Sequence, residues 1–150
     1  MKKVALFIIT ALTVLLFSSC RSGNENTPDD PSIQKTHIAH RFSITSSAPV
    51  TVQFTAAIGM GDIYFNGVNE NKTSIIKEVA HEGTKTYTIS ALGYILTSNV
   101  LVTSLDGKEV EVSYTWNLLS NDKVVKAEKE VTEKGTVITS KVYSTTISDF

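Results

Sequence analysis

The side chains that could do metal chemistry in this chain begin with three histidines. His37 and His40 lie three positions apart, which on a strand places them on opposite faces, whereas metal ligands must converge. His81 and Glu82 begin the HExxH pattern of a zinc helix, but Gly83-Thr84-Lys85 follow and the second histidine is missing. The histidines therefore predict no zinc site, and we expect His81 to lie in a loop.

An oxygen-rich stretch near the middle of the chain could in principle chelate calcium. It contains Asp62, Asn66, Asn69, Glu70 and Asn71. The spacing is not that of an EF-hand loop, and these residue types are also the ones that tight turns require. We expect turns here, and the sequence predicts no metal or other cofactor.

Catalytic patterns have little support. Serine and threonine are abundant, but the chain has no G-x-S-x-G elbow and no glycine-rich phosphate loop. Glu109 and Glu111 share a strand face beside lysines, which is typical of a solvated charge row. We expect a protein that is not an enzyme. The alternative is a hydrolase, which would need a histidine and a carboxylate converging on a serine or threonine in one cleft.

Aromatic side chains could form a stacking platform for sugars. Most of them fall on inward positions of expected strands, so core packing is favoured and a glycan surface is the alternative. The residues concerned are Tyr64, Tyr87, Tyr94, Tyr114, Trp116 and Tyr143.

Cys20 is the only thiol of the chain, and it directly follows a segment with the composition of an export leader. Two lysines precede an uncharged run over residues 4–17, and two small serines come just before the cysteine. The run is too short for a membrane-spanning helix, which needs about 20 apolar residues. We expect residues 1–19 to be removed as a signal peptide, and a single cysteine leaves no disulfide.

The sequence Leu16-Phe17-Ser18-Ser19-Cys20 resembles the lipobox of bacterial lipoproteins. In that family the cysteine thiol takes a diacylglycerol, the preceding bond is cleaved, and the new N-terminus usually takes a fatty acid such as palmitate. Phe17 departs from the leucine that the family more often has there. The resemblance implies lipidation at Cys20 and a stable membrane anchor, because two or three acyl chains hold where a single chain does not.

Residues 20–32 are polar and rich in Pro, Gly, Ser, Asn and Asp, which predicts a flexible tether behind the lipidated cysteine. The acidic residues Glu25, Asp29 and Asp30 resemble the export signals of surface lipoproteins in Bacteroidota. Arg21 occupies the position where an aspartate would retain an enterobacterial lipoprotein at the inner membrane. We expect the outer membrane, with the protein facing either the periplasm or the cell surface.

The charge balance argues against nucleic acid as a partner. Removing Lys2 and Lys3 with the leader lowers the basic count from 14 to 12 against 15 acidic residues, a formal net charge of −3. The lysines are interleaved with glutamates and form no basic patch of the kind that nucleic-acid binders carry.

Residues 33–150 are expected to form one all-β domain, because period-two alternation and turn residues recur throughout. The alternation is clearest in residues 50–58 and 110–118. Expected strands cover residues 33–44, 50–58, 63–65, 73–80 (or one helical turn there), 84–91, 94–105 (buried on both faces), 110–118, 123–132 (a charged edge) and 136–147. Expected turns lie at Asn66-Gly67, at Ser120 to Asp122, at Glu133 to Gly135 and, as the strongest hairpin signal, at Asp106-Gly107.

Seven to nine strands, the last three forming a meander, predict an antiparallel β-sandwich of immunoglobulin-like or transthyretin-like type. This resemblance is one of fold only, because the Cys…Trp…Cys framework of true immunoglobulin domains is absent. The alternative fold is a small up-and-down β-barrel of lipocalin type. We expect a lipid-anchored cell-envelope protein whose sandwich binds a protein partner or joins an envelope assembly. The alternative function is a module that binds a small apolar ligand or a glycan.

Overall fold

The computed structural model describes residues 36–93 and 95–146, and every regular element within them is a β-strand. The signal peptide, Cys20 and the tether lie outside these residues. The strands are β1 (Thr36–Ile58), β2 (Ile63–Phe65), β3 (Val68–Asn69), β4 (Ser74–Gly93), β5 (Ile95–Ser104), β6 (Val110–Ser120), β7 (Lys123–Ala127), β8 (Val131–Gly135), β9 (Val137–Thr139) and β10 (Tyr143–Thr146). They number ten, above the seven to nine expected.

The two longest strands, β1 and β4, pair antiparallel along almost their whole length. The register shifts once, between Ser46 and Val50, where three residues of β1 face one residue of β4. Pro49 lies in this bulge, where its missing N–H leaves no ladder bond unmade. A bulge of this kind bends its strand. Residues 46–49 therefore interrupt the ladder as expected, although the strands on either side form one element.

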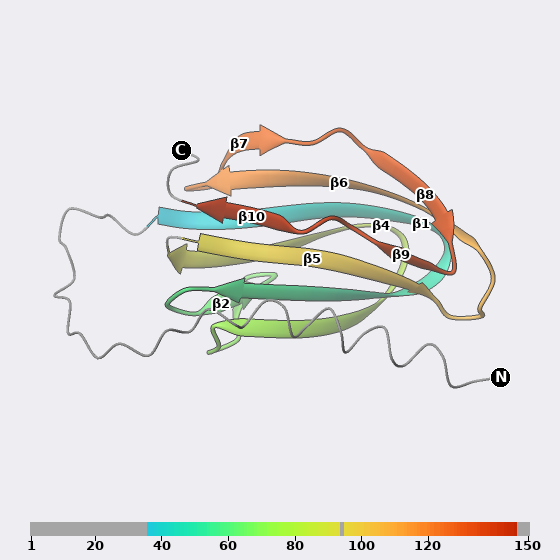
Figure 1. The fold of residues 1–150 in the computed structure, drawn as a ribbon, viewed down its shortest axis with the longest axis horizontal. Coiled ribbons are helices and arrows are strands. Elements are labelled where there is room, and N and C mark those ends of the chain that lie inside the picture. Colours follow the sequence, from blue (N-terminus) through green and yellow to red (C-terminus); the bar gives the residue numbers. More distant parts are fainter. Residues whose placement is uncertain (1–35, 94, 147–150) are drawn as a thin grey trace, which may run out of the picture. The chain divides into compact units, whose positions relative to one another are not determined.

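At the bulge β1 changes its second neighbour, and this change makes two layers. Residues 38–46 pair with β6, whereas residues 50–58 pair with β5. The ring centroids of Phe42 and Phe54, one from each half of β1, lie 6.0 Å apart. The two halves of the strand therefore face each other across the core, as Figure 1 lets the reader follow. The prediction of an all-β antiparallel sandwich is confirmed.

Phe54 lies at the centre of the core. Its ring is 4.8 Å from that of Tyr87 and 5.2 Å from that of Phe65, between centroids. The alternating faces of β1, β5 and β6 supply most of the other buried side chains. A hollow between the layers, beside Phe42 and Ile138, holds only about 10 Å³, which is room for about one water molecule.

The connection after β5 corrects the strongest hairpin prediction. Asp106 accepts hydrogen bonds from the Ser104 hydroxyl (2.9 Å) and the Lys108 N–H (3.0 Å), and Gly107 has a φ of 71°. The turn exists, but β5 pairs with β1, β9 and β10, whereas β6 pairs with β1, β7 and β8. The segment crosses from one layer to the other. The described strands therefore lack the neighbour-to-neighbour order of an up-and-down barrel.

The C-terminal meander also differs from the expectation. β7 and β8 both pair with β6, at its end and at its beginning, so residues 133–135 belong to a strand and make no turn. The expected strand over 136–147 is split into β9 and β10, which both pair with β5. The split occurs at Ser140, whose hydroxyl accepts the N–H of Val100 at 2.9 Å in place of a backbone carbonyl.

Two further expectations are corrected by local geometry. Residues 73–80 and 84–91 form the single strand β4, because Gly83 continues the ladder with a φ of 69°. β5 buries only one face, since Leu96 and Val102 are buried whereas Leu105, just beyond the strand, is exposed. The one-sided burial of β5 has a simple cause, because a strand in a sandwich layer has one face on the core and the other towards solvent.

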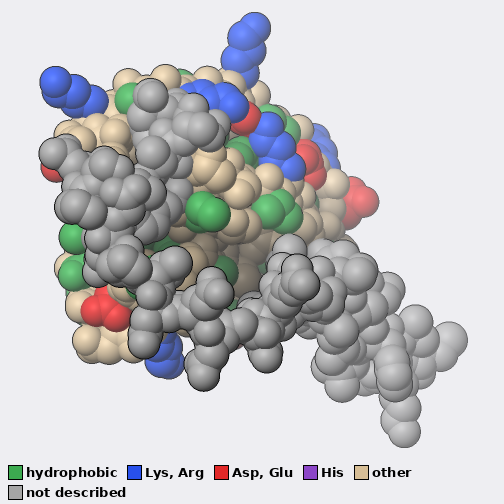
Figure 2. All heavy atoms as spheres, turned by 60° about the vertical axis from the view of Figure 1, so that its left-hand side comes forward, with side chains coloured by type: hydrophobic (Ala, Val, Ile, Leu, Met, Phe, Trp, Pro, Cys, Tyr) green, Lys and Arg blue, Asp and Glu red, His purple; other side chains and the backbone are tan. Residues whose placement is uncertain are grey.

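Two of the expected tight turns are present. Asn66-Gly67 and Asn121-Asp122 have the positive φ values of a two-residue hairpin turn, as expected. Asn121 lies at the end of the domain at which β1 begins, since its N–H donates to the carbonyl oxygen of His37 at 2.9 Å. Figure 2 brings this end forward and shows hydrophobic side chains reaching the surface there.

Candidate functional site

Cys20, the lipidation site that the sequence predicts, lies outside the described residues, as do residues 1–19 and the tether. Within residues 36–93 and 95–146 no helix has the length and apolar character that crossing a membrane would require. The site residues that the structure does place are the histidines, the oxygen-rich turns and the aromatic rings.

The three histidines lie apart and play different parts. His37 is half-exposed, with Nδ1 3.8 Å from the carboxylate of Asp122. His40 is fully buried on the opposite face of β1, as the spacing predicts. The expectation that His81 lies in a loop is wrong. His81 is buried inside β4, where its Nδ1 lies 2.9 Å from the Tyr87 hydroxyl. No group of three possible metal ligands gathers among the residues that the structure describes.

His40 bridges the two layers between two hydroxyl groups. Nδ1 lies 2.7 Å from the Ser98 hydroxyl in β5, and Nε2 lies 2.8 Å from the Thr145 hydroxyl in β10. Burial lowers the pKa of His40 to about 4, so the ring is neutral at pH 7. Both hydroxyls are buried as well, and the partner of each ring nitrogen is thus a hydroxyl and not a carboxylate. The cluster lacks the open cleft and the acid that the hydrolase alternative requires.

The oxygen-rich stretch is occupied with turn formation, as expected. The side chain of Asn66 accepts the N–H of Thr88 at 2.9 Å, and that of Asn69 accepts the N–H of Asn71 at 2.7 Å. Asn69 also donates to the carboxylate of Asp62 at 3.2 Å. Glu70 pairs with a lysine ammonium at 2.7 Å. The side chains of Asp62, Asn66, Asn69 and Glu70 are thus engaged within the chain.

Most of the aromatic side chains pack in the core, as favoured from the sequence. Tyr87, Tyr114, Trp116 and Tyr143 are buried, which leaves no open ring face on which a sugar could stack. Tyr64 is half-buried. Tyr94 lies outside the described residues. The narrow hollow between the layers likewise leaves no room for the apolar ligand of the alternative function.

A further candidate binding surface is one side of the sandwich, which is formed by edge strands of both layers. We call it the open edge and define it as residues 123–146, from β7 to β10. β7 and β8 pair only with β6, and β9 and β10 only with β5, among the described strands. Five valines of the open edge are exposed: Val124, Val125, Val131, Val137 and Val142.

β7 projects beyond the layer to which it belongs. Successive side chains of a strand point to opposite faces, so one of two neighbouring apolar residues is normally buried. In β7 all five side chains are exposed, including the adjacent Val124 and Val125. Its outer backbone edge is unpaired among the described strands. The strand therefore offers both apolar side chains and backbone hydrogen-bonding groups to a neighbour.

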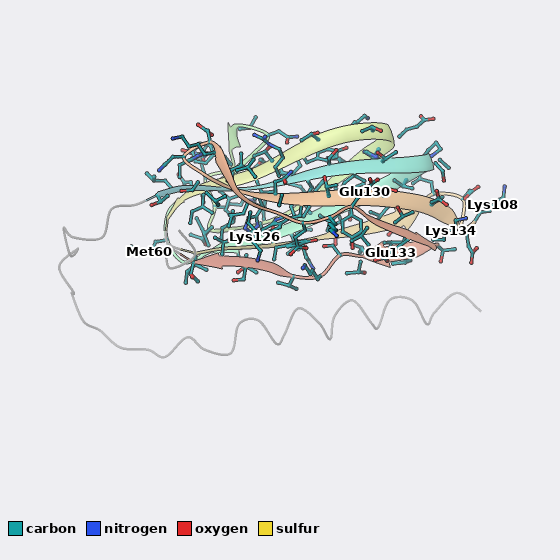
Figure 3. All side chains as sticks on the ribbon, turned by 90° about the horizontal axis from the view of Figure 1, so that it is seen from above. Met60, Lys108, Lys126, Glu130, Glu133 and Lys134 are labelled. Carbon is teal, nitrogen blue, oxygen red and sulfur yellow. The ribbon has the colours of Figure 1, made fainter. Side chains whose placement is uncertain are left out.

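Charged groups cover the aromatic rings beneath the open edge. The rings of Trp116 and Tyr143 stack with centroids 4.5 Å apart. The ammonium of Lys126 lies 5.9 Å from the Trp116 ring, and that of Lys141 lies 5.3 Å from the Tyr143 ring. Lys141 also pairs with Glu128 at 2.6 Å, which joins the segment after β7 to the segment before β10. Figure 3 looks onto this side and labels Lys126, Glu130 and Glu133 along it.

A second polar contact lies further along the open edge. The Tyr114 hydroxyl donates to the carboxylate of Glu133 at 3.3 Å, and burial followed by the Glu133 charge raises the pKa of Tyr114. Lys134 pairs with Glu111 at 3.0 Å across β8 and β6. These groups can bind and orient a partner, whereas no nucleophile is activated among them.

Sequence reasoning foresaw the charged edge but missed two features. The alternation of lysine and glutamate over 123–132 predicts the edge itself. Nothing local signals that His40 meets Ser98 and Thr145, because these residues lie far apart in the chain. The adjacent pair Val124-Val125 between lysines was the available signal for the projection of β7, since a clean half-buried strand would alternate.

Two solved structures of Bacteroides proteins are similar to this chain. One, a domain of unknown function, DUF4425, from Bacteroides vulgatus, has a TM-score of 0.51 at 19% identity and covers 75% of this chain and 97% of that chain. The other, a DUF4425 family protein from Bacteroides ovatus, has a TM-score of 0.44 at 17% identity. The match covers 75% of this chain and 95% of the Bacteroides ovatus chain. At 19% identity the first likeness shows a shared fold alone. No protein family and no curated protein matches the chain.

Proposed function

We propose that this chain is a lipid-anchored protein of the bacterial cell envelope, which holds a rigid β-sandwich at the outer membrane and binds a protein partner through the open edge. The role is binding or assembly and not catalysis. The observation that carries the proposal is the exposed strand β7, which pairs with β6 on one side and has no partner among the described strands on its outer edge, beside a tightly packed core.

The anchor half of the proposal rests on the sequence. Cys20 follows a leader and a lipobox-like motif, and it is the only cysteine. The solved neighbours come from Bacteroides, which is consistent with the likeness of residues 25–30 to the export signals of Bacteroidota lipoproteins. A lipid at Cys20 would tether the domain through residues 21–35 to the first residue of β1.

The partner half rests on the geometry of the open edge. An extended segment of a partner can add to an unpaired strand, because backbone hydrogen bonds give affinity and side-chain contacts give specificity. Val124 and Val125 supply apolar contacts on both sides of β7. The lysines at both sides of these valines favour a partner segment with carboxylates and disfavour pairing of β7 with a second copy of itself.

A site-specific crosslinking experiment tests the partner half. A photoreactive residue replaces Val125 in one strain and Val68, another exposed valine, which lies in β3, in a second strain. Irradiation of intact cells should give one discrete adduct from position 125, and it should disappear when Val124 is changed to Asp. Identical adducts from both positions, or none from position 125, would contradict the role of the open edge.

The anchor half is tested by the change Cys20→Ala. The variant should fail to take up labelled palmitate and should leave the membrane fraction, because the thiol that receives the diacylglycerol is gone. Uptake or membrane retention equal to that of the unchanged protein would refute lipidation at this residue.

A further inference from the structure

We propose that the end of the sandwich at which β1 begins is a membrane-contacting surface, which rests on the lipid bilayer that holds the Cys20 anchor. This inference depends on the proposed anchor and adds to it the orientation of the domain. We call this surface the tether end and define it by Met60, Leu92 and Ile95, three exposed apolar side chains from three different segments.

The backbone brings these three segments together. Thr36, the first residue of β1, pairs with Gly93, so the chain enters the domain next to Leu92. A Cβ on Gly93 would lie 3.3 Å from the carbonyl oxygen of Met60, which places the loop after β1 directly against the end of β4. Ile95 begins β5, one residue before the buried Leu96 that pairs with Ile58. The apolar residues thus surround the point where the tether joins the domain.

The glycines at this point keep the loops close. Gly61 has a φ of 96°, and a Cβ there would lie 3.1 Å from the carbonyl oxygen of Leu92. A side chain at position 61 would be strained and would also push the two loops apart. The close packing of the backbones turns Met60 and Leu92 outward into solvent.

The tether end differs from the far end in that three exposed apolar side chains from three segments gather there, although it also carries the exposed contact between His37 and the Asp122 carboxylate. Figure 3 labels Met60 at one end and Lys108 and Lys134 at the other. The far end carries the ion pairs Lys108–Asp106 at 3.4 Å and Lys134–Glu111 at 3.0 Å. Exposed apolar side chains that gather at one end lower the free energy of contact with an apolar phase, whereas ionised side chains oppose it.

The length of the tether is our reason for proposing that the tether end contacts a lipid bilayer. Fifteen residues separate Cys20 from Thr36. Fully extended they would span about 50 Å, but a flexible chain of this length has an average end-to-end distance of about 20 Å. An acylated Cys20 therefore keeps the tether end near the lipid surface at high effective concentration, so that even a weak apolar contact is populated.

The test uses the full chain, acylated at Cys20 and reconstituted into vesicles of phosphatidylethanolamine and phosphatidylglycerol. Because Cys20 is the only native cysteine and its sulfur carries the lipid, a cysteine introduced at position 60 or 105 can be labelled alone with an environment-sensitive fluorophore. Met60 and Leu105 are matched, since they are 60% and 62% exposed at opposite ends of the domain. The labelled variants are M60C and L105C.

We expect the fluorophore at position 60 to shift its emission to the blue and to be quenched by lipids that carry a spin label in the acyl chain. The fluorophore at position 105 should emit as in water. Adding L92E and I95E to M60C should abolish the shift and the quenching, while adding L105E should leave both unchanged. Emission of the single tryptophan, Trp116, verifies that each variant is folded.

Equal behaviour of the two fluorophores in vesicle-bound protein would overturn the membrane contact and leave the anchor standing. A blue shift at position 60 without quenching by spin-labelled lipids would mean that a protein surface covers this end, and would also overturn the proposal. Failure of the acylated chain to float with the vesicles would refute the anchor, and the orientation would fall with it.

Discussion

His40 occupies an inward position of β1 where the alternation of the strand would place an apolar side chain. A buried polar group costs stability unless it is hydrogen-bonded, and both ring nitrogens of His40 have a hydroxyl partner from the opposite layer. The edge of the imidazole also packs on Trp116 at 5.3 Å between centroids. The ring therefore ties β10, a strand of only four residues, to the centre of the domain.

Protonation of His40 should weaken the fold in mild acid. Its folded pKa of about 4 lies below the ordinary histidine pKa of 6.5, so between these values the unfolded chain binds the proton and the folded chain does not. The free energy of unfolding therefore has its full value above pH 6.5. It decreases as the pH falls towards 4, by at most about 3 kcal/mol from this group. Urea denaturation at a series of pH values measures this slope.

The change His40→Gln should remove most of the slope, because the side chain no longer titrates. A smaller slope should persist from His81, since burial lowers the pKa of that ring too. The matched control is His37→Gln on the exposed face of the same strand, which leaves the buried ring of His40 in place. If H40Q and H37Q gave the same pH dependence, His40 would not be the group that titrates.

At the scale of elements, the fold depends on the bend of the β1–β4 pair. The bulge between Ser46 and Val50 lies opposite Glu82, the residue before Gly83, and the strand partners of β1 change at this point. Without the bend, residues 38–46 and 50–58 would lie in one flat sheet and Phe42 could not meet Phe54. One irregular stretch thus converts a long hairpin into two layers.

Gly83→Ala should destabilise the domain by about 1 kcal/mol, the cost of holding a residue with a Cβ in the left-handed region. The cause would be the backbone alone, because Gly83 has a φ of 69° and no atom lies within 4 Å of an added Cβ. Gly59→Ala is the matched control, since it has the same open space without a positive φ. The difference between their free energies of unfolding in urea measures the strain, and equal values would contradict it.

The ion pair between Glu128 and Lys141 joins the two outer edges of the sandwich. We expect a small coupling free energy of about 0.2 to 1 kcal/mol, because both groups are near solvent and screened. A double-mutant cycle with E128Q and K141M measures the coupling, which should fall in high salt. A coupling that is unchanged by salt would mean that the link between the edges is not electrostatic.

At the scale of the whole molecule, one core joins both layers and the surface is divided by chemistry. The rings of Phe42, Phe54, Phe65 and Tyr87 contact one another across the layers. The outside has a tether end with exposed Met60, Leu92 and Ile95, a far end with two ion pairs, and an open edge with exposed valines. Under the proposed function, these separate surfaces would let the anchored domain contact the bilayer and a partner at different places.

Phe54→Ala should reduce the free energy of unfolding by about 3 to 5 kcal/mol, because it removes the ring at the centre of the core and leaves a cavity. This loss is a large part of the roughly 5 to 15 kcal/mol that a domain usually has. Ile76→Ala, on the exposed face of β4, should change stability by less than about 0.5 kcal/mol. Trp116 fluorescence in urea follows both variants, and similar losses would mean that Phe54 is not central.

The sequence by itself determined what depends on neighbouring residues. Alternation in residues 50–58 and 110–118 predicted which faces are buried, and Asn66-Gly67 and Asn121-Asp122 predicted tight turns, because side-chain direction and φ preference are local properties. The same local signals predicted a leader and a lipidated Cys20, which stay predictions because those residues lie outside the described part of the chain.

Only the tertiary structure decided which strands are neighbours. Asp106-Gly107 has the composition of a hairpin turn but connects strands of different layers, since a turn specifies a change of direction and not a pairing partner. Three further features depend on contacts between distant segments of the chain. They are the hydrogen bonds of His40 to Ser98 and Thr145, the exposure of β7, and the proximity of Met60, Leu92 and Ile95. Such contacts form only when the bent β1–β4 pair brings the two layers together, and no local pattern encodes that geometry.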